Sequence, residues 1–284
     1  MKSALTLFFS FIACLQGFAQ IDISFLSEKS SNAILLRDRT EFNIFKDNKS
    51  SLKRNYEAVI KNGHASSLTN VVIHYDQFQK VKHAEIVLKS LDGKVIEEYK
   101  LRDFEDWTTD FSGVASDARA KVLKPVYSRY PYVISVSYEV EKEGSLHYPI
   151  WMPQSAEKLR VISAKFVVND YENNAFRYEA KNVQKPEITT LVDRKTYVWK
   201  VKDLDPFEVE KYSYSIEEYA PVVYTAPTVF QMEYYRGDMH TWNSFGKWIQ
   251  KLNAGKNDLD GTDLTDLDQL VAQAGSAEEK VKIV

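Results

Sequence analysis

The sequence has 284 residues and a nearly balanced charge, with 37 Lys and Arg against 40 Asp and Glu and a net charge of −3. Hydrophobic residues make up 44% and aromatic residues 13%, which suffices for a sizeable core and excludes a wholly disordered chain. The interspersed charges lack the basic footprint of nucleic-acid-binding proteins, so no nucleic-acid partner is expected. The length suits one large β domain or two smaller ones.

The N-terminus has the features of a secretory signal peptide. Lys2 supplies a positive charge, 4–15 is an apolar run, and small residues precede a cleavage site after Ala19. The run is too short to cross a bilayer, so no transmembrane segment is expected. We therefore predict a signal peptide at 1–19 and a mature chain exported to the periplasm or the cell surface.

The single cysteine, Cys14, lies inside this signal peptide. A lipid anchor at Cys14 is disfavoured, because Phe11 is a poor substitute for the usual Leu of a lipoprotein box and a better cleavage site follows. After cleavage the chain would have no disulfide, no thiolate nucleophile and no thiolate metal ligand.

Alternating apolar and polar residues predict a series of strands after the signal peptide. In 81–101, two alternating runs flank Asp92-Gly93, a dipeptide that tolerates the positive backbone angles of a type I′ hairpin turn. Further strands are predicted at 53–61, 69–75, 130–140, 160–168, 176–180, 196–202, 209–216 and 222–235. Three other segments are assigned differently: 27–36 to a short helix or irregular chain, 104–114 to a loop, and 149–153 to a turn.

These strands, with no regular helices between them, predict a mostly β fold of the antiparallel β-sandwich type, as one extended sandwich or two stacked lobes. The β domain is placed at 20–236, with possible lobes at 20–155 and 156–236. A short helical segment at the C-terminus completes the predicted fold.

The hydrophobic period changes from two to 3.6 residues after Thr241, which predicts a capped amphipathic helix that ends at Gly255. Its apolar stripe consists of Trp242, Phe245, Trp248, Ile249 and Leu252. Burial of each large side chain is worth about 1.5–3 kcal/mol, so the stripe should cover the β domain or brace a following domain. The stripe is our candidate interdomain contact.

The last residues contain a polar spacer and the start of another helix. The spacer contains Asp258, Asp260, Asp263, Asp266 and Asp268, and it lacks the ligand pattern of an EF-hand, so we interpret it as a linker. Ser276 and Glu279 form a capping box, but the helix that they open is shorter than the dozen or more residues that an isolated helix needs. We expect that the native or ancestral polypeptide continued beyond 237–284.

Few residues offer catalytic or metal-binding chemistry. The histidines are His64, His74, His83, His147 and His240, and none pairs at metal-ligand spacing, so no metal and no cofactor is expected. Acidic residues surround Trp107 in one predicted loop: Asp103, Glu105, Asp106 and Asp110. Two carboxylates beside an aromatic ring could serve a glycosidase, but proximity in a loop does not fix their separation, and a solvated acidic turn is the simpler interpretation.

Aromatic residues are abundant from Tyr197 onward: Trp199, Tyr212, Tyr214, Tyr219, Tyr224, Tyr234 and Tyr235. Exposed rings could stack on sugars or accept a peptide. Tyr and Trp are also favoured in strands, where they pack across neighbouring strands.

Several segments together resemble a bacterial family, the exported domain of unknown function found N-terminal to transglutaminase-like domains. The segments are 75–107, 116–119, 130–132 and 146–154, followed by the helix at 242–255 and the start at 276–284. The resemblance implies that a following domain carries a papain-like Cys-His-Asp constellation. No residue here can take those roles, and we expect that 237–284 holds the helix, the linker and a truncated start of that domain.

We therefore expect a non-catalytic exported module that positions or selects substrate for a transglutaminase-like cysteine enzyme, with no catalytic residues of its own. One alternative is a stand-alone carbohydrate- or peptide-binding protein of the cell surface. A second alternative is a carboxylate-dependent hydrolase built on 103–110.

Overall fold

The computed structural model describes residues 26–46, 48–109, 117–144, 146–171, 176–256 and 264–283. The signal peptide predicted at 1–19, with Cys14, lies outside the described residues, as do Asp110, Asp258, Asp260 and Asp263. None of the described helices has the length and apolar character needed to cross a bilayer.

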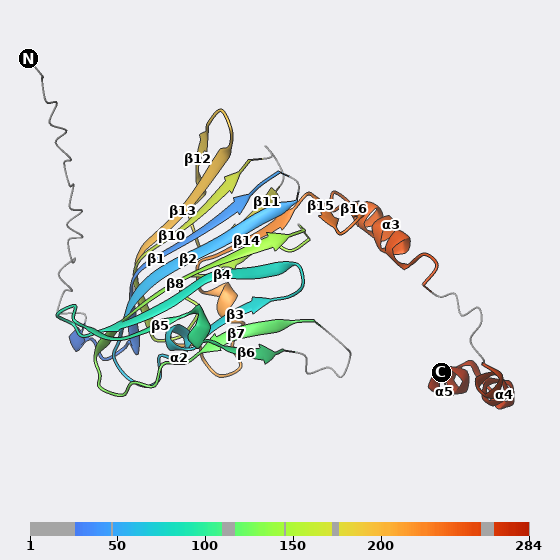
Figure 1. Cartoon of the computed structure of the whole chain (residues 1–284), viewed down its shortest axis with the longest axis horizontal. Coiled ribbons are helices and arrows are strands. Elements are labelled where there is room, and N and C mark those ends of the chain that lie inside the picture. The colour runs from blue at the N-terminus through green and yellow to red at the C-terminus, as the bar shows by residue number, and fades with distance from the viewer. Residues whose placement is uncertain are drawn as a thin grey trace, which may run out of the picture.

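A large sheet of eight strands forms the body of the molecule (Figure 1). Its strands are, in spatial order, β12 (Glu187–Thr190), β13 (Lys195–Leu204), β10 (Leu159–Asp170), β1 (Ala33–Ile44), β2 (Lys49–Ile60), β8 (Tyr132–Glu143), β4 (Gln79–Lys89) and β5 (Val95–Lys100). All neighbours pair antiparallel except β1 and β10, which are parallel.

Three small sheets accompany it. Their strands are β11 (Phe176–Lys181), β14 (Val222–Pro227) and β9 (Ile150–Trp151) in the first, β3 (Val71–Tyr75), β7 (Arg119–Leu123) and β6 (Glu105–Thr108) in the second, and β15 (Val229–Met232) and β16 (Tyr235–Asp238) in the third. The helices are α2 (Ser66–Thr69), α3 (Trp242–Asn253), α4 (Thr265–Gln273) and α5 (Ala277–Ile283), with 3₁₀ turns η1 (Leu101–Asp103) and η2 (Ile216–Glu218).

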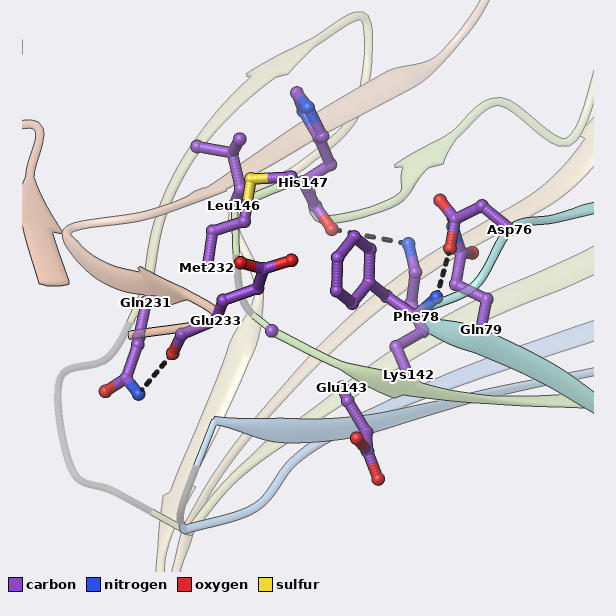
Figure 2. A pocket seen from close by; sticks show the side chains of 11 residues that line it. Asp76, Phe78, Gln79, Lys142, Glu143, Leu146, His147, Gln231, Met232 and Glu233 are labelled. Atoms are coloured by element: carbon purple, nitrogen blue, oxygen red, sulfur yellow. Dashed lines mark hydrogen bonds between the residues drawn. The ribbon is translucent and has the colours of Figure 1, made fainter. Parts of the chain in front are cut away.

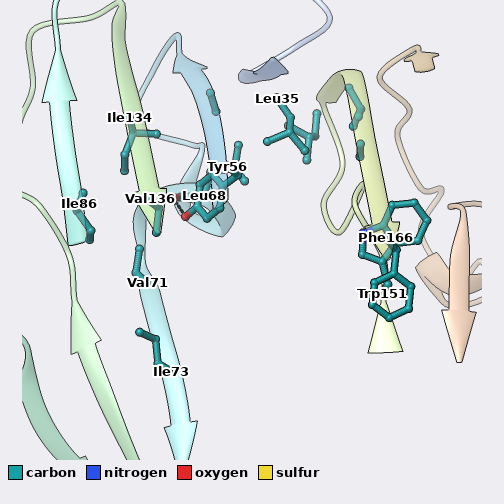
Figure 3. Close-up of a cluster of buried hydrophobic side chains, with 14 of the residues drawn as sticks. Leu35, Tyr56, Leu68, Val71, Ile73, Ile86, Ile134, Val136, Trp151 and Phe166 are labelled. Carbon is teal, nitrogen blue, oxygen red and sulfur yellow. Dashed lines mark hydrogen bonds between the residues drawn. The ribbon is translucent and has the colours of Figure 1, made fainter. Parts of the chain in front are cut away.

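Two of the small sheets pack against the same face of the large sheet and enclose the main core (Figure 3). Val71 and Ile73 of β3 meet Ile86 and Ile134 of the large sheet in this cluster. In the other half, the ring of Trp151 stacks on Phe166 with centroids 5.7 Å apart. Because successive strand residues point to opposite faces, each long strand contributes every second side chain to this core.

The opposite face of the large sheet, which we call the open face, carries mostly polar side chains. Near one end it also has a small apolar cluster of Ile34, Val59 and Val133, on which Leu26 packs. The chain before β1 is fixed there because Arg160 Nε donates to Glu28 Oε2 at 2.7 Å. That hydrogen bond, together with the Arg160 charge, lowers the pKa of Glu28 against the opposing effect of burial.

One charged pair lies on the core side of the large sheet. Arg54 Nη2 and Nε donate to Asp38 Oδ2 at 2.7 and 3.1 Å, and the side chain of Asp38 is fully buried. Burial by itself lowers the pKa of Arg54, but the Asp38 carboxylate outweighs this and raises it above its ordinary value. Such a pair depends on both partners, because either charge alone would be stranded in the interior.

The predicted hairpin at 81–101 is confirmed as β4 and β5, with Ala84, Ile86 and Leu88 buried. Its turn is longer than a two-residue type I′ turn: Ser90 N donates to Lys94 O, and a register shift lies between Leu88 and Lys89. Only Gly93 has a positive φ, of 85°, so this glycine alone supplies the left-handed position that the loop needs.

Several local predictions are wrong. The segment 27–36, predicted as helix or irregular chain, contains the start of β1, and the loop predicted at 104–114 contains β6. No strand forms at 209–216, and 222–235 divides into β14 and β15 before the start of β16. The turn predicted at 149–153 includes β9, whose Trp151 is buried. Part of the predicted linker is helical, because Asp266 and Asp268 lie in the first turn of α4.

The side-chain alternation within β10 is irregular at one point. Val161 faces the main core and Ile162 packs on the open-face cluster, whereas the order reverses from Ala164 onward. The pairing with β1 is interrupted between Leu35/Val161 and Asp38/Ala164 and resumes in the same register, and β1 has a register shift with β2 at this point, between Leu35 and Arg37. The large sheet draws strands from both 20–155 and 156–236, so one sheet crosses the possible lobe boundary.

Candidate functional site

The predicted amphipathic helix is confirmed as α3, and it forms a small unit with the hairpin that precedes it. We call β15, β16 and α3 the hairpin–helix unit; it projects from one end of the large sheet (Figure 1). Thr241 caps the helix, since Ser244 N donates to Thr241 Oγ1 at 3.0 Å and Thr241 N donates to Ser244 Oγ at 3.1 Å. These bonds satisfy helix-end amides that would otherwise lack partners.

Part of the predicted stripe holds α3 on its own hairpin. The ring of Trp248 lies 4.8 Å from Phe230 of β15 and 5.7 Å from Phe245, and Trp248 is 5% exposed. A Cβ atom at Gly237 of β16 would lie 2.4 Å from Phe230 Cζ and 2.7 Å from Trp248 Cδ1. Only glycine allows this close approach, and sequence reasoning did not single it out.

The rest of the stripe is partly or fully accessible to solvent. Trp242 is 90% exposed and Ile249 is 37% exposed, whereas Leu252 is half-buried. Among the five predicted contact residues, the structure therefore separates an anchoring pair, Phe245 and Trp248, from an exposed pair. Contact with another domain through any of them stays a prediction.

A side-chain hydrogen bond attaches the unit beside the first small sheet: Arg177 Nη1 of β11 donates to Met239 O at 3.1 Å. Met239 N donates to Thr228 O at 2.9 Å, which extends the pairing of β15 with β16. A cavity of about 380 Å³ lies next to this attachment and is lined by Arg177, Trp242 and Phe245, among others. Arg177 is a positioning residue that no sequence signal indicated.

A recess on the other side of the unit separates the hairpin turn from the end of the large sheet (Figure 2). Gln231, Met232 and Glu233 form its wall on the hairpin side, opposite Phe78 and Lys142. Its volume is only about 70 Å³, too little for a sizeable ligand. The recess is therefore a seam between two parts of the chain.

The seam contains one partly desolvated amine. Burial lowers the pKa of Lys142, and the Asp76 carboxylate opposes that shift. Lys142 Nζ donates to His147 O at 3.4 Å, while Asp76 accepts from Phe78 N at 2.8 Å and Gln79 Nε2 at 2.7 Å. These bonds fix the loops that the hairpin turn meets.

The acidic residues proposed for a hydrolase have different hydrogen-bond partners in the fold. Asp106 Oδ1 accepts from Arg119 Nε at 3.0 Å, Oδ2 accepts from Lys121 Nζ at 3.1 Å, and Tyr75 donates to the same carboxylate. The Arg119 bond, followed by the Tyr75 bond, lowers the pKa of Asp106 to about 2. At neutral pH this carboxyl group is ionised, so it could act as a base but not as a general acid.

The neighbouring acids have local structural roles. Glu105 Oε2 accepts from Trp107 Nε1 at 2.7 Å, and Asp103 Oδ2 accepts from Lys100 N at 2.7 Å at the start of η1. Asp106 is therefore paired with the cationic side chains of Arg119 and Lys121, whereas Glu105 and Asp103 accept hydrogen bonds from a tryptophan ring and a backbone amide. Trp107 itself is 55% exposed.

The histidines make separate polar contacts. His83 Nε2 lies 2.9 Å from Ser137 Oγ on the open face, and His240 Nδ1 lies 3.3 Å from Asp238 Oδ1 before α3. In the part of the chain that the structure describes, no three His, Cys, Asp or Glu residues gather as metal ligands would.

The aromatic residues from Tyr197 onward differ in their exposure to solvent. Tyr197 and Trp199 pack in the main core, as cross-strand packing predicts. Tyr212, Tyr214 and Tyr234 are 93%, 79% and 94% exposed, and they lie in loops at different places in the chain. They do not form a ring-lined platform together with Trp199.

Solved structures were compared with this fold. A crystal structure from Parabacteroides distasonis ATCC 8503, described as a “putative protease”, matches with a TM-score of 0.61 at 15% identity, covering 89% of this chain and 49% of that one. Legionella pneumophila aminopeptidase A matches with a TM-score of 0.33 at 9% identity over 72% of this chain and 22% of that one. A “putative nutrient binding protein” of Legionella pneumophila matches with a TM-score of 0.34 at 9% identity, covering 89% of this chain and 78% of that one.

The first of these matches shows a shared fold, and this chain spans about half the length of that protein, 49%. The large sheet with its two covering small sheets is thus a mostly β fold that also occurs in a longer protein. The family described as Domain of Unknown Function with solved-structure structure (DUF3857) matches residues 46–208, and the chain belongs to that family. No curated protein matches the chain.

Proposed function

We propose that the chain is a non-catalytic exported module that positions or selects substrate for a transglutaminase-like cysteine-enzyme domain. The exposed part of α3 carries the proposal: Trp242 is 90% exposed and Ile249 is 37% exposed on a helix that Trp248 already anchors. Exposed tryptophans are frequent anchors of protein interfaces. In this proposal, Trp242 and Ile249 form the docking surface for the enzyme domain.

The fold match supports the same assignment. The Parabacteroides protein described as a “putative protease” has this fold over 49% of its length, so the fold occurs beside further chain in a protein of that description. The proposed export rests on the signal peptide predicted at 1–19. The enzyme partner rests on the family resemblance together with the exposed α3 residues.

The docking surface can be tested by photo-crosslinking in the organism from which the sequence comes. The full chain would carry p-benzoylphenylalanine at position 242 or, as control, at Tyr234, which is 94% exposed in the same unit. We expect a cross-link at position 242 to a polypeptide whose mass-spectrometric sequence includes a transglutaminase-like domain. Equal capture from both positions, or a product without such a domain, would contradict the proposal.

The absence of intrinsic activity can be tested with the mature chain, residues 20–284, incubated with casein and dansylcadaverine. We expect neither cleavage nor amine incorporation. Either reaction in the purified chain would overturn the non-catalytic assignment. Hydrolysis that disappears in Asp106→Asn would support the carboxylate-dependent hydrolase instead.

A second candidate function is stand-alone binding of a carbohydrate or peptide at the cell surface. One observation favours it: the exposed ring of Trp242 borders the cavity of about 380 Å³. A tryptophan face beside a cavity can stack on a sugar ring or a side chain. Thermal-shift screening against cell-wall glycans and peptides distinguishes this function, since its ligand would raise the melting temperature of the wild type but not of Trp242→Ala.

A further inference from the structure

The strand β12 is one edge of the large sheet, and its hairpin with β13 projects at that edge (Figure 1). Leu191 N donates to Arg194 O at 2.8 Å at the end of the hairpin, so Thr189, two residues back, also directs its peptide groups to β13. The N–H and C=O groups of Ile188 and Thr190 therefore point away from the sheet. Within the described part of the chain, no strand pairs with this side of β12.

Apolar side chains accompany these outward peptide groups. Ile188 is 49% exposed, Leu191 is 43% exposed and Val192 is 106% exposed. An edge strand with free peptide groups and apolar side chains is a template for pairing with another strand. The strand is short and follows Pro186, which has no N–H, so only a short segment can pair with it.

The edge is complementary to a second copy of itself. If two copies of β12 lie antiparallel about a two-fold axis at Thr189, Ile188 of each copy pairs with Thr190 of the other, and about four backbone hydrogen bonds form. Lys185 precedes a proline, which favours an extended backbone, so it continues the line of the strand. Lys185 then lies beside Asp193 of the second copy, and unlike charges meet at both ends of the paired strands.

The neighbouring two-fold registers are less favourable. An axis at Thr190 would place Glu187 opposite Asp193 of the second copy, and like charges opposite each other are destabilising. An axis at Ile188 would place Pro186 opposite Thr190 of the second copy and leave that carbonyl without a donor. Charge and hydrogen bonding therefore select the axis at the residue between Ile188 and Thr190.

We propose that two copies of the chain associate by pairing their β12 edges antiparallel about Thr189, which joins their two large sheets into one. The pairing also places Pro186 of the second copy opposite the exposed Val192. Because the paired segment is short, the association is weak and depends on concentration. It uses no residue of α3 and stands apart from the docking surface.

The test is disulfide trapping in the mature chain, residues 20–284, which contains no cysteine. Thr189→Cys places the two thiols at a non-hydrogen-bonded pair, whose Cα atoms lie about 4.5 Å apart, within reach of a disulfide. Thr190→Cys is the matched control, because its two copies lie diagonally, about 7–8 Å apart. Val192→Cys, at the most exposed of these positions, measures random collision.

Under mild oxidation, non-reducing electrophoresis should show a covalent dimer that forms about tenfold faster with Thr189→Cys than with either control, because pairing raises the effective concentration of the thiols. Equal rates in the three variants, or faster trapping of Val192→Cys, would overturn the proposal.

A charge exchange tests the register. In the Thr189→Cys chain, Lys185→Asp or Asp193→Lys brings like charges together and should slow trapping by about threefold to tenfold. The two substitutions combined restore unlike pairs and should restore the rate. Single substitutions without effect, or a combination as slow as the single ones, would contradict the pairing about Thr189.

Discussion

The large sheet and the hairpin–helix unit differ in how they are stabilised. The sheet is covered on one face by two small sheets, and its core extends continuously from Val71 of β3 to Trp199 of β13. The unit has its own aromatic cluster around Trp248 and is joined to the rest through a few hydrogen bonds and a shallow seam. A region with few buried contacts to its neighbours can open separately from the main core. We infer that the unit opens before the sheet unfolds.

The largest expected effect belongs to the sheet. Asp38→Ala leaves the Arg54 guanidinium without its carboxylate in the interior and should reduce the free energy of unfolding by about 3–5 kcal/mol. Urea denaturation followed by circular dichroism measures this change. Lys82→Ala, which removes an exposed pair with Glu141, should cost less than about 1 kcal/mol. Similar losses in the two variants would show that the buried pair does not stabilise the sheet.

The next effect belongs to the unit. Trp248→Ala removes the side chain that joins α3 to β15 and should destabilise the unit locally by about 3–5 kcal/mol. Hydrogen exchange should accelerate in 229–253, whereas strands such as β2 should keep their protection. The melting temperature should also fall, or the chain should associate through the uncovered Phe230 and Phe245. Trp242→Ala is the control and should change neither property. A Trp248→Ala chain that melts and associates as the wild type does would refute the anchoring role.

A smaller effect is expected for the close approach at Gly237. Gly237→Ala places a methyl group against Phe230 and Trp248 and should cost about 1–3 kcal/mol, again confined to the unit. Gly246→Ala is the matched control in α3: its Cβ would meet nothing within 4 Å, so helix propensity should make it stabilising by about 0.5–1 kcal/mol. Hydrogen exchange of the α3 amides measures both changes. A stabilising Gly237→Ala would contradict the packing described.

The smallest effect concerns pH at the seam. Burial lowers the pKa of Lys142 below its ordinary value of 10.5, so between the two values the unfolded chain binds more protons and stability rises with pH. Lys142→Met has no amine to keep charged against burial, so it should be at least as stable as the wild type at pH 7. The difference in free energy of unfolding between variant and wild type should shrink as the pH approaches 10.5. A difference that grows over this range would show that the charged amine is stabilised at the seam.

The sequence predicted those features that depend on short-range patterns. Alternation placed a strand at 53–61, which lies within β2 and buries Tyr56, Ala58 and Ile60, and the Thr241 cap with its apolar stripe placed α3. Local patterns failed where long-range pairing decides the structure. β1 pairs with the adjacent β2 as well as with the distant β10, and it was missed because two buried polar residues, Asp38 and Thr40, interrupt its apolar alternation. β6 was missed because its four exposed residues have no apolar alternation.

In the candidate site, too, short-range patterns predicted some features and missed those that depend on long-range contacts. Periodicity grouped Trp242 with Trp248, but it could not show which tryptophan meets the hairpin, because that depends on the orientation of α3 against Gly237. Arg177 and Lys142 act through backbone carbonyls, those of Met239 and His147, and such contacts leave no motif. The outward direction of the β12 peptide groups likewise emerges only from the register of β12 with β13.

Native-state hydrogen exchange of the wild-type mature chain tests most directly whether the hairpin–helix unit is an independent element. The amides of β15, β16 and α3 should exchange through an opening that requires less free energy than the opening of β1, β2, β8 and β10. Exchange of both regions with one common opening free energy would contradict this and would make the unit an integral part of the sheet's fold.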